Sequence, residues 1–288
     1  MIIVTGGYGF IGSNIIHELN RRGHTDILVV DDLTNGVAYK NLLGAKFIYY
    51  IDVDQFFTRF TEWNQVTAVY HQGAISSTVE TNGKLVMDRN YQFTLDLLHE
   101  CAKHKIPVSY ASSASVYGNK KDKTFDPLNL YAYSKMLIDE WVEHNLNSFA
   151  LIHGWRYFNV YGNREEHKGN QASPVTKFRL QAQDTGLIKL FKGSDEIYRD
   201  FVAVDDVVKV VINAMQPGIL SSGIRDLGTG RVTSFETVAH LIQRKYGGKV
   251  QIVPFPENLK PGYQWFTKAQ PVPNNSGFTS LADWLSRQ

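Results

Sequence analysis

The chain has 288 residues, which allows one large domain or two moderate ones and a substantial core. Lys and Arg number 30 against 28 Asp and Glu, and the formal charge of +2 argues against a strongly basic nucleic-acid-binding protein. The single cysteine, Cys101, cannot form an internal disulfide, so we expect a cytoplasmic protein. No apolar run approaches the ~18 residues of a membrane-spanning helix, and we expect no leader peptide and no membrane partner.

Short apolar runs alternate with longer amphipathic stretches in the first half of the chain. This alternation is typical of βαβ units around a parallel sheet. Helices are predicted from residue 11 to a stop near Gly23, over 91–105 and over 131–145. Buried strands are predicted at 2–5, 27–31, 47–51, 67–71, 108–112 and 149–156. We therefore expect an α/β fold with a Rossmann-type, doubly wound parallel sheet over residues 1–158.

Beyond residue 158 the composition of the sequence changes. Glycine, proline and polar clusters separate shorter segments, as in 162–173 and 254–273. This pattern predicts a smaller C-terminal lobe over 159–288. A strand-like segment at 202–204 and a helical pattern at 207–215 indicate that the chain returns to the first domain at about 200–215. A closing helix is expected around 283–285.

A glycine-rich turn, Thr5-Gly6-Gly7-Tyr8-Gly9-Phe10-Ile11-Gly12, follows the first predicted strand and opens the first predicted helix. Glycines at this place allow a tight turn and a close approach of the backbone to a pyrophosphate at the helix N-terminus. A glycine motif by itself is a weak signal, but the strand before it, the helix after it and a second strand ending in Asp31 strengthen it. We predict that residues 1–158 bind a dinucleotide.

Acidic residues at the ends of the next two strands bear on which dinucleotide is bound. Asp31 is expected to accept hydrogen bonds from the adenosine ribose, and Asp32 disfavours a 2′-phosphate. Both residues favour NAD, although Lys40 is close enough in sequence to leave NADP open. Asp52 and Val53 are candidate contacts to the adenine, while a plain strand-terminal Asp52 is comparably plausible.

Three residues later in the chain suggest redox chemistry at an alcohol. Ser113 follows the fifth predicted strand, and Tyr131 and Lys135 lie one turn apart on one helix face. A phenol with a pKa near ~10 is a poor base at neutral pH, but the Lys135 ammonium and a positively charged nicotinamide favour its ionised form. We expect Ser113 to contact the reacting oxygen of the substrate and Lys135 to hold the nicotinamide ribose.

Together with the stretch Arg156-Tyr157-Phe158-Asn159, these motifs resemble the extended short-chain dehydrogenase/reductase family of nucleotide-sugar epimerases and dehydratases. The resemblance covers nearly the whole chain. Within that family, five stretches look like the ADP-L-glycero-D-manno-heptose 6-epimerases: 1–7, 156–162, Arg164-Glu165-x-His167-Lys168-Gly169, 199–202 and Tyr263-Gln264-x-Phe266-Thr267.

This resemblance implies an isomerase that removes a hydride from a sugar carbon and returns it through a tightly bound NAD or NADP. It implies Tyr131 as one proton carrier and Lys168 as the other, a homo-oligomer, and a nucleotide-diphosphate sugar as partner. The lobe over 159–288 would then bind substrate. Further cofactor positions implied are Phe10, Ile11, Gln72, Gly73, Ala74, Asn90 and Val160. Substrate positions implied are Ser76, Asn159, Asn170, Phe191, Lys192, Gly193, Ser194, Arg199 and Tyr263, where the guanidinium fork of Arg199 suits a diphosphate.

The sequence also departs from the pattern of that family. Gln72 stands where Glu is usual, Asn170 where Ser is usual, Lys177 where His is usual, and Ala38 where a lysine often supports NADP. The alternatives are another nucleotide-sugar 4-epimerase or a dehydratase, or a non-catalytic dinucleotide-binding regulator. No His, Cys and Asp cluster has metal-ligand spacing, and basic residues are scattered, so we expect neither a metal nor a nucleic-acid partner.

Overall fold

The structure is a computed structural model that describes residues 1–270 and 277–288. The described chain divides into two compact units, each treated by itself below. Unit 1 comprises 1–113, 129–156 and 208–225, and unit 2 comprises 114–128, 157–207 and 226–288. Within the described residues, no helix combines the length and the apolarity that crossing a bilayer needs.

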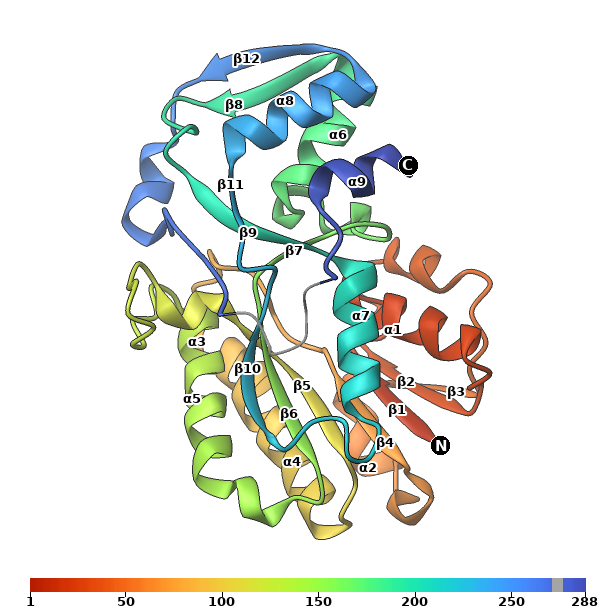
Figure 1. Cartoon of the computed structure of the whole chain (residues 1–288). Coiled ribbons are helices and arrows are strands. Elements are labelled where there is room, and N and C mark those ends of the chain that lie inside the picture. The colour runs from red at the N-terminus through yellow and green to blue at the C-terminus, as the bar shows by residue number, and fades with distance from the viewer. Residues whose placement is uncertain (271–276) are drawn as a thin grey trace. The chain divides into compact units, whose positions relative to one another are not determined.

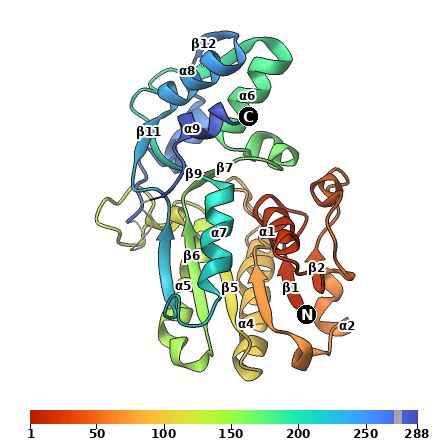
Figure 2. The same ribbon diagram turned by 45° about the vertical axis from the view of Figure 1, so that its right-hand side comes forward.

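A seven-stranded sheet in the order β10-β6-β5-β4-β1-β2-β3 forms the centre of unit 1 (Figure 1). The strand pairs from β3 through β5 are parallel, as the sequence predicts. Helices α1 and α7 lie on one face of the sheet, and α4 and α5 lie on the other (Figures 1 and 2). The strands are β1 (Ile2–Thr5), β2 (Ile27–Asp31), β3 (Tyr49–Asp52), β4 (Ala68–His71), β5 (Val108–Ser113), β6 (Ile152–Tyr157) and β10 (Gly223–Leu227). The helices are α1 (Phe10–Arg21), α2 (Phe56–Arg59), α3 (Gly83–Val86), α4 (Phe93–Lys103), α5 (Leu130–Asn145) and α7 (Val204–Ala214).

Hydrophobic periodicity explains the core of unit 1. The strands β1 and β2 are apolar along almost their whole length because both faces of the sheet are covered. Leu97, Leu98 and Cys101 of α4 are fully buried in the cluster that covers one face. The strand predicted at 47–51 is observed as β3, which lies at the edge of the sheet and leaves Tyr49 exposed. The expectation that this strand is buried is therefore wrong.

Unit 2 contains a three-stranded sheet in the order β11-β9-β7 and a two-stranded sheet of β12 and β8. A second hydrophobic cluster joins β7, β8, β9 and β12 to the helices of the unit. The segment expected at 202–204 is the end of β9, which pairs within unit 2, whereas the chain rejoins unit 1 from residue 208 and adds β10 to the large sheet. The elements are β7 (Asn159–Tyr161), β8 (Leu187–Phe191), β9 (Tyr198–Ala203), β11 (Val232–Ser234), β12 (Lys249–Val253), α6 (Pro174–Thr185), α8 (Phe235–Tyr246) and α9 (Leu281–Ser286).

The turn between β1 and α1 is packed backbone against backbone. A Cβ atom at Gly12 would lie 2.1 Å from the carbonyl oxygen of Gly6, and one at Gly6 would lie 2.5 Å from the amide nitrogen of Gly73. Gly6 also has φ +65°, a left-handed conformation that disfavours any other residue. The glycines are therefore required by the contact between the ends of β1 and β4 and the start of α1.

We predict that Gly12→Ala destabilises the protein by about 1–3 kcal/mol, although alanine is the better helix former, because its Cβ forces the backbone of Gly6 to move. Urea denaturation of the cofactor-free protein measures the change. Gly36→Ala is the matched control, since its Cβ would meet nothing within 4 Å, and we expect a change within ~0.5 kcal/mol. Equal stability of the two variants would contradict the proposed constraint.

Candidate functional site

The N-terminus of α1 has the properties of a phosphate site. No side chain caps this end of the helix, its first turn contains no acidic residue, and Gly9 at the N-cap presents no side chain. The N–H groups of a first turn have no intrahelical partner, and a helix N-terminus favours negative charge. The turn therefore fits the pyrophosphate of a dinucleotide, with Gly6, Gly9, Phe10, Ile11 and Gly12 as the residues that would hold it.

Asp31, at the end of β2, is hydrogen-bonded to the backbone of this turn. Its Oδ2 accepts a hydrogen bond from the Tyr8 amide at 2.6 Å, and its Oδ1 accepts one from the Asp32 amide at 2.8 Å. Burial raises the pKa of the Asp31 carboxyl, and these two amide hydrogen bonds oppose that rise. Asp31 thus orders the turn that we expect to bind the cofactor, a function that the sequence reasoning did not assign to it.

A group of acidic side chains follows β2 and β3. Asp32 Oδ1 accepts a hydrogen bond from the Thr34 amide at 2.7 Å, and hydrogen bonds from Thr34 lower the pKa of Asp32. Asp52, followed by Val53, caps a short helix by accepting from the Asp54 amide at 2.9 Å. Arg89 forms an ion pair with Asp54 at 2.6 Å, and the sequence reasoning missed this basic residue. Asp32 therefore remains ionised at neutral pH.

The loop after β4 is held by two side chains from elsewhere in unit 1. Thr5 Oγ1 accepts from the Gly73 amide at 3.2 Å. Asn90 Oδ1 accepts from the Ile75 amide at 2.8 Å, while its Nδ2 donates to Ile75 O and to Ser134 Oγ, both at 3.0 Å. Asn90 lies in a π-helix, Met87–Gln92, a rare conformation often found at functional sites. The half-buried residues Gln72 and Ala74 and the exposed Ser76 belong to the same loop.

Ser113 and Tyr131 are brought together at the end of β5 and the start of α5. Their side chains share a hydrogen bond that lowers the pKa of Tyr131, but burial has the larger effect and raises it. The Asn129 side chain caps α5 by accepting from the Ala132 amide at 2.9 Å, which fixes the first turn that carries Tyr131. In the protein without cofactor, burial therefore outweighs the hydrogen bond from Ser113 and favours the neutral phenol. The expectation that Lys135 and a bound nicotinamide favour its ionised form stays a prediction.

Lys135 is almost fully buried one turn further along α5. Its ammonium donates to the carbonyl oxygen of Ala111 at 2.7 Å, and burial lowers its pKa to about 8. Asp139, another turn along the same face, partly opposes this shift. The Asp139 carboxylate is itself fully buried and accepts from Tyr110, Ser112 and Arg156 at 3.0, 2.8 and 2.7 Å. The spacing of 131, 135 and 139 by four residues could have identified Asp139 from the sequence.

In unit 2, Lys168 lies on a short helical loop, Glu166–Gln171. Hydrogen bonds of the preceding residue, Glu165, hold this loop in place. The buried Glu165 carboxylate accepts from the Ser173 amide and hydroxyl at 2.6 and 2.7 Å and from Thr176 Oγ1 at 2.6 Å. Lys168 is half-buried, and burial lowers its pKa while Glu165 opposes that effect. Glu165 therefore fixes the loop to the start of α6 and supplies the nearby negative charge.

Lys177 projects from α6 toward the same loop. Its ammonium donates to the carbonyl oxygen of Asn170 at 3.3 Å, and its pKa is lowered mainly by burial and further by the charge of Lys168. The Asn170 side chain is exposed. The charges of Lys168 and Lys177 thus affect one another beside Glu165, and the backbone of Asn170 in the loop binds Lys177 of α6.

A second group in unit 2 surrounds Arg199 of β9. Arg199 is 5% exposed, and burial lowers its pKa to about 10. Its guanidinium lies 5.5 Å from the ring centre of Tyr263, and among the described residues no carboxylate pairs with it. Tyr263 contacts Phe255, which contacts Phe191 at the end of β8 with ring centres 5.3 Å apart. Arg199 is therefore a buried cation available to an anion, rather than part of a surface ion pair.

The remaining positions of unit 2 are less distinctive. Ser194 has a buried hydroxyl with no hydrogen-bond partner among the described residues, whereas Lys192 is exposed and Gly193 is half-buried. Asn159 Oδ1 accepts from Thr267 Oγ1 at 3.4 Å, and the neighbouring Val160 is half-buried.

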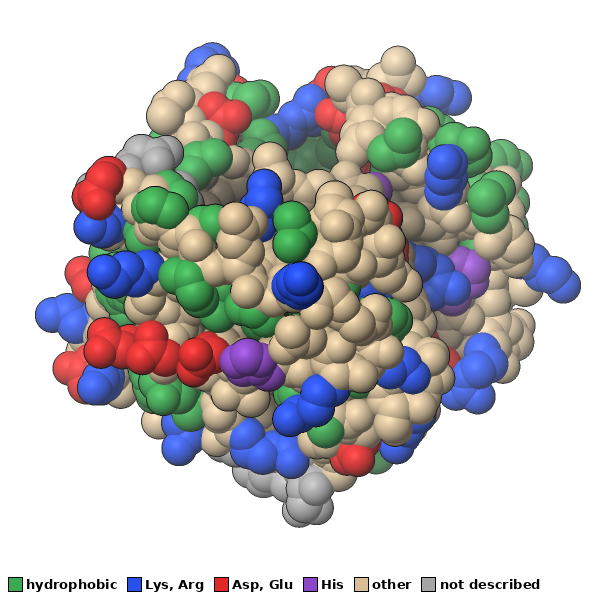
Figure 3. Space-filling view, turned by 90° about the horizontal axis from the view of Figure 1, so that it is seen from above, with side chains coloured by type: hydrophobic (Ala, Val, Ile, Leu, Met, Phe, Trp, Pro, Cys, Tyr) green, Lys and Arg blue, Asp and Glu red, His purple; other side chains and the backbone are tan. Residues whose placement is uncertain are grey.

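No group of three or more His, Cys, Asp or Glu side chains that could hold a metal ion occurs within residues 1–270 and 277–288. On the face drawn in Figure 3, Lys and Arg side chains are scattered among acidic and apolar ones.

Comparison with known proteins gives a consistent result. The sequence profile of the NAD dependent epimerase/dehydratase family matches residues 2–220. The crystal structure of Helicobacter pylori ADP-L-glycero-D-manno-heptose-6-epimerase has 32% sequence identity and a TM-score of 0.87, over 99% of this chain and 94% of that one. Thermus thermophilus UDP-glucose 4-epimerase in complex with NAD has 27% identity and a TM-score of 0.78, over 94% and 90% of the two chains. The chain therefore belongs to the NAD dependent epimerase/dehydratase family.

Proposed function

We propose that this protein is a nucleotide-sugar epimerase that interconverts ADP-D-glycero- and ADP-L-glycero-D-manno-heptose at C6″. The observation that carries the proposal is a second candidate proton carrier, Lys168, half-buried on the loop that Glu165 anchors. Epimerisation of an alcohol carbon needs a proton carrier for each orientation of the oxygen, because the proton lost in one orientation is restored in the other. The likeness to the Helicobacter pylori enzyme supports the heptose as substrate.

Tyr131 is the first proton carrier in this proposal. A nicotinamide dinucleotide held by the glycine turn and Lys135 would supply the chemistry for hydride removal from C6″ and its return to the other face. Ser113 holds the reacting oxygen against the Tyr131 hydroxyl, with which it shares a hydrogen bond. The buried Lys135 binds the nicotinamide ribose and supplies positive charge beside the phenol, which favours release of its proton.

Lys168 is the second proton carrier. Burial lowers its pKa, so a larger fraction of the amine is neutral and able to accept a proton than for an exposed lysine. The substrate diphosphate is bound by Arg199, whose planar guanidinium can donate to two oxygens at once. Tyr263 and Phe191 offer aromatic surface to the nucleotide, and the free hydroxyl of Ser194 is a further donor.

Substrate identity is tested directly by incubating the protein with ADP-D-glycero-D-manno-heptose and, separately, with UDP-glucose, and by following the products by NMR. We expect the heptose to be epimerised at C6″ and UDP-glucose to remain unchanged. Turnover of UDP-glucose alone would replace the proposal with a 4-epimerase.

The cofactor is expected to be NAD, because the ionised Asp32 repels a 2′-phosphate, and Ala38 supplies no positive charge to bind one. Asp32→Ala should therefore shift the ratio of NADP to NAD affinity toward NADP. Fluorescence titration of both cofactors measures the ratio. Asp184→Ala, which removes an exposed carboxylate of α6, should leave it unchanged. An identical shift in both variants would mean that Asp32 acts only through net charge.

Tyr131→Phe should lower the turnover number by about 10²- to 10⁴-fold while cofactor affinity is kept, because the variant lacks only the oxygen that carries the proton. Steady-state kinetics and cofactor titration of the same preparation separate the two effects. Activity equal to that of the parent would remove Tyr131 from the mechanism.

Lys168→Met should abolish epimerisation with little change in stability, because Lys168 lies on a surface loop. The two single variants, at Tyr131 and at Lys168, should slow the two epimers unequally when each epimer is supplied separately, since each carrier serves one oxygen orientation. Lys189→Met, an exposed lysine of β8, is the control and should be fully active. Parent-like turnover of both epimers by Lys168→Met would contradict the assignment.

A further inference from the structure

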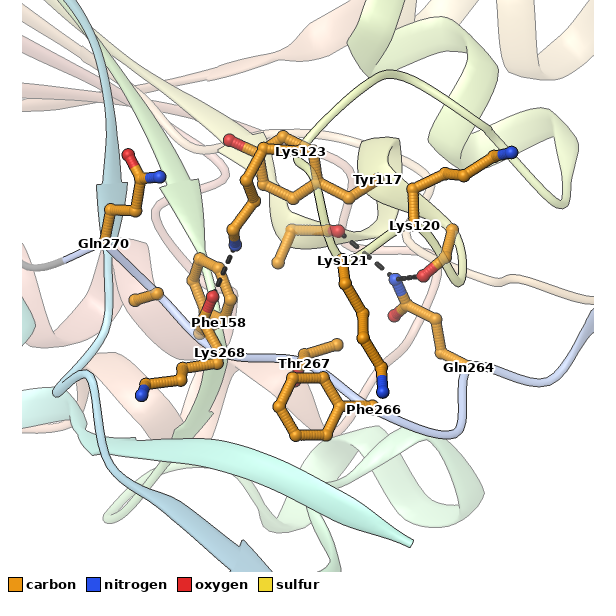
Figure 4. A pocket seen from close by; sticks show the side chains of 13 residues that line it. Tyr117, Lys120, Lys121, Lys123, Phe158, Gln264, Phe266, Thr267, Lys268 and Gln270 are labelled. Carbon is orange, nitrogen blue, oxygen red and sulfur yellow. Dashed lines mark hydrogen bonds between the residues drawn. The ribbon is translucent and has the colours of Figure 1, made fainter.

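A cavity of about 210 Å³ in unit 2 is not used by the proposed reaction. Four of its thirteen lining residues are lysines and none is acidic. Figure 4 shows Lys121 and Lys123 extending toward Phe266 and Phe158, while the ammonium groups of Lys120 and Lys268 point away. The volume lies below the ~300 Å³ at which typical small-molecule sites begin, so the cavity suits one sugar-sized group rather than a whole nucleotide sugar.

Lys121 provides an available positive charge. Its ammonium lies 5.5 Å from the ring centre of Phe266, and among the described residues no carboxylate pairs with it. Lys123, by contrast, is partly neutralised. It forms an ion pair with Asp226 at 3.2 Å and donates to the carbonyl oxygen of Lys268, which leaves one of its three N–H groups for a ligand.

The loop that carries Lys121 and Lys123 has an unusual backbone conformation. Lys123 has φ +66°, a conformation rarely adopted by a residue with a side chain. The turn is stabilised by Asp122 Oδ1, which accepts from the amide and the hydroxyl of Thr124 at 3.1 and 2.7 Å. In this conformation the Lys123 ammonium lies 4.3 and 4.7 Å from the ring centres of Tyr117 and Phe158.

Gln264 adds an oriented acceptor to the cavity. Its Nε2 donates to the carbonyl oxygens of Ala114 and Gly118 at 3.2 and 2.7 Å, which fixes the amide. Nothing in the described part of the chain donates to its Oε1. A ligand that complements this cavity has an anionic group for Lys121, a hydroxyl for Gln264 and a flat apolar face for Phe158 and Phe266.

We propose that this cavity binds a sugar acid or a sugar phosphate. The carboxylate or phosphate would accept from Lys121 and from the remaining N–H of Lys123, a hydroxyl would donate to Gln264, and the carbon face of the sugar ring would lie against the aromatic side chains. This binding does not depend on the epimerase reaction proposed above.

The test is calorimetric titration of the full-length protein with sodium D-glucuronate and with D-glucose 6-phosphate at constant ionic strength, with D-glucose as the neutral probe. We expect saturable binding of at least one of the two acids and weaker binding of glucose. Lys121→Met should weaken the binding of the acid about tenfold, as expected for the loss of a charged hydrogen bond. Lys121→Arg should restore most of it.

Lys245→Met, an exposed lysine of α8, is the control for net charge and should bind like the parent. Absence of saturable binding by both acids would overturn the proposal, and so would equal losses in the Lys121 and Lys245 variants. The titration is repeated with ADP-glucose present. We expect the acid to bind unchanged, because the cavity suits one sugar-sized group rather than a whole nucleotide sugar. Displacement of the acid by ADP-glucose would overturn the assignment of a separate site.

Discussion

The structure of unit 1 depends on the close backbone contact among Gly6, Gly12 and Gly73. These three residues belong to the turn after β1, the first turn of α1 and the loop after β4, and there is no room for a side chain between them. The same contact leaves the N-terminus of α1 without a covering side chain. One steric constraint therefore fixes the meeting of three elements and shapes the surface that we propose binds the phosphates of the cofactor, so we expect the stability of this region and cofactor binding to change together.

Burial of charge determines the chemistry of the remaining residues. A buried ammonium or guanidinium loses its hydration, which lowers its pKa, and the protein opposes this loss with a few placed oxygens. The Lys135 ammonium donates a hydrogen bond to Ala111 O, and the negative charge of Asp139 raises its pKa against the effect of burial. The negative charge of Glu165 does the same for Lys168. Arg199 has aromatic neighbours but no described carboxylate. Desolvation makes Lys135 and Lys168 readier to release a proton than exposed lysines, and Arg199 is suited to bind an anion.

The sequence predicted most elements of the large sheet. Strong periodicity explains this success, since β1 and β2 occur at the predicted residues. Edge position cannot be read from one strand, so the exposure of β3 was missed. The anchoring by Glu165 and the ion pair of Arg89 were also missed, because both depend on side-chain contacts that the sequence pattern does not show. The roles assigned to site residues stay predictions.

Asn90 links the loop after β4 to helix α5. Its amide holds the backbone of Ile75 from both sides and also binds Ser134, the residue before Lys135. Displacement of the loop after β4 would therefore break hydrogen bonds to a buried amide or pull on the first turns of α5. Substitutions in that loop, even ones that touch no ligand, should be transmitted to the geometry of Tyr131 and Lys135. The loop and the helix are thus expected to vary together when such enzymes are redesigned.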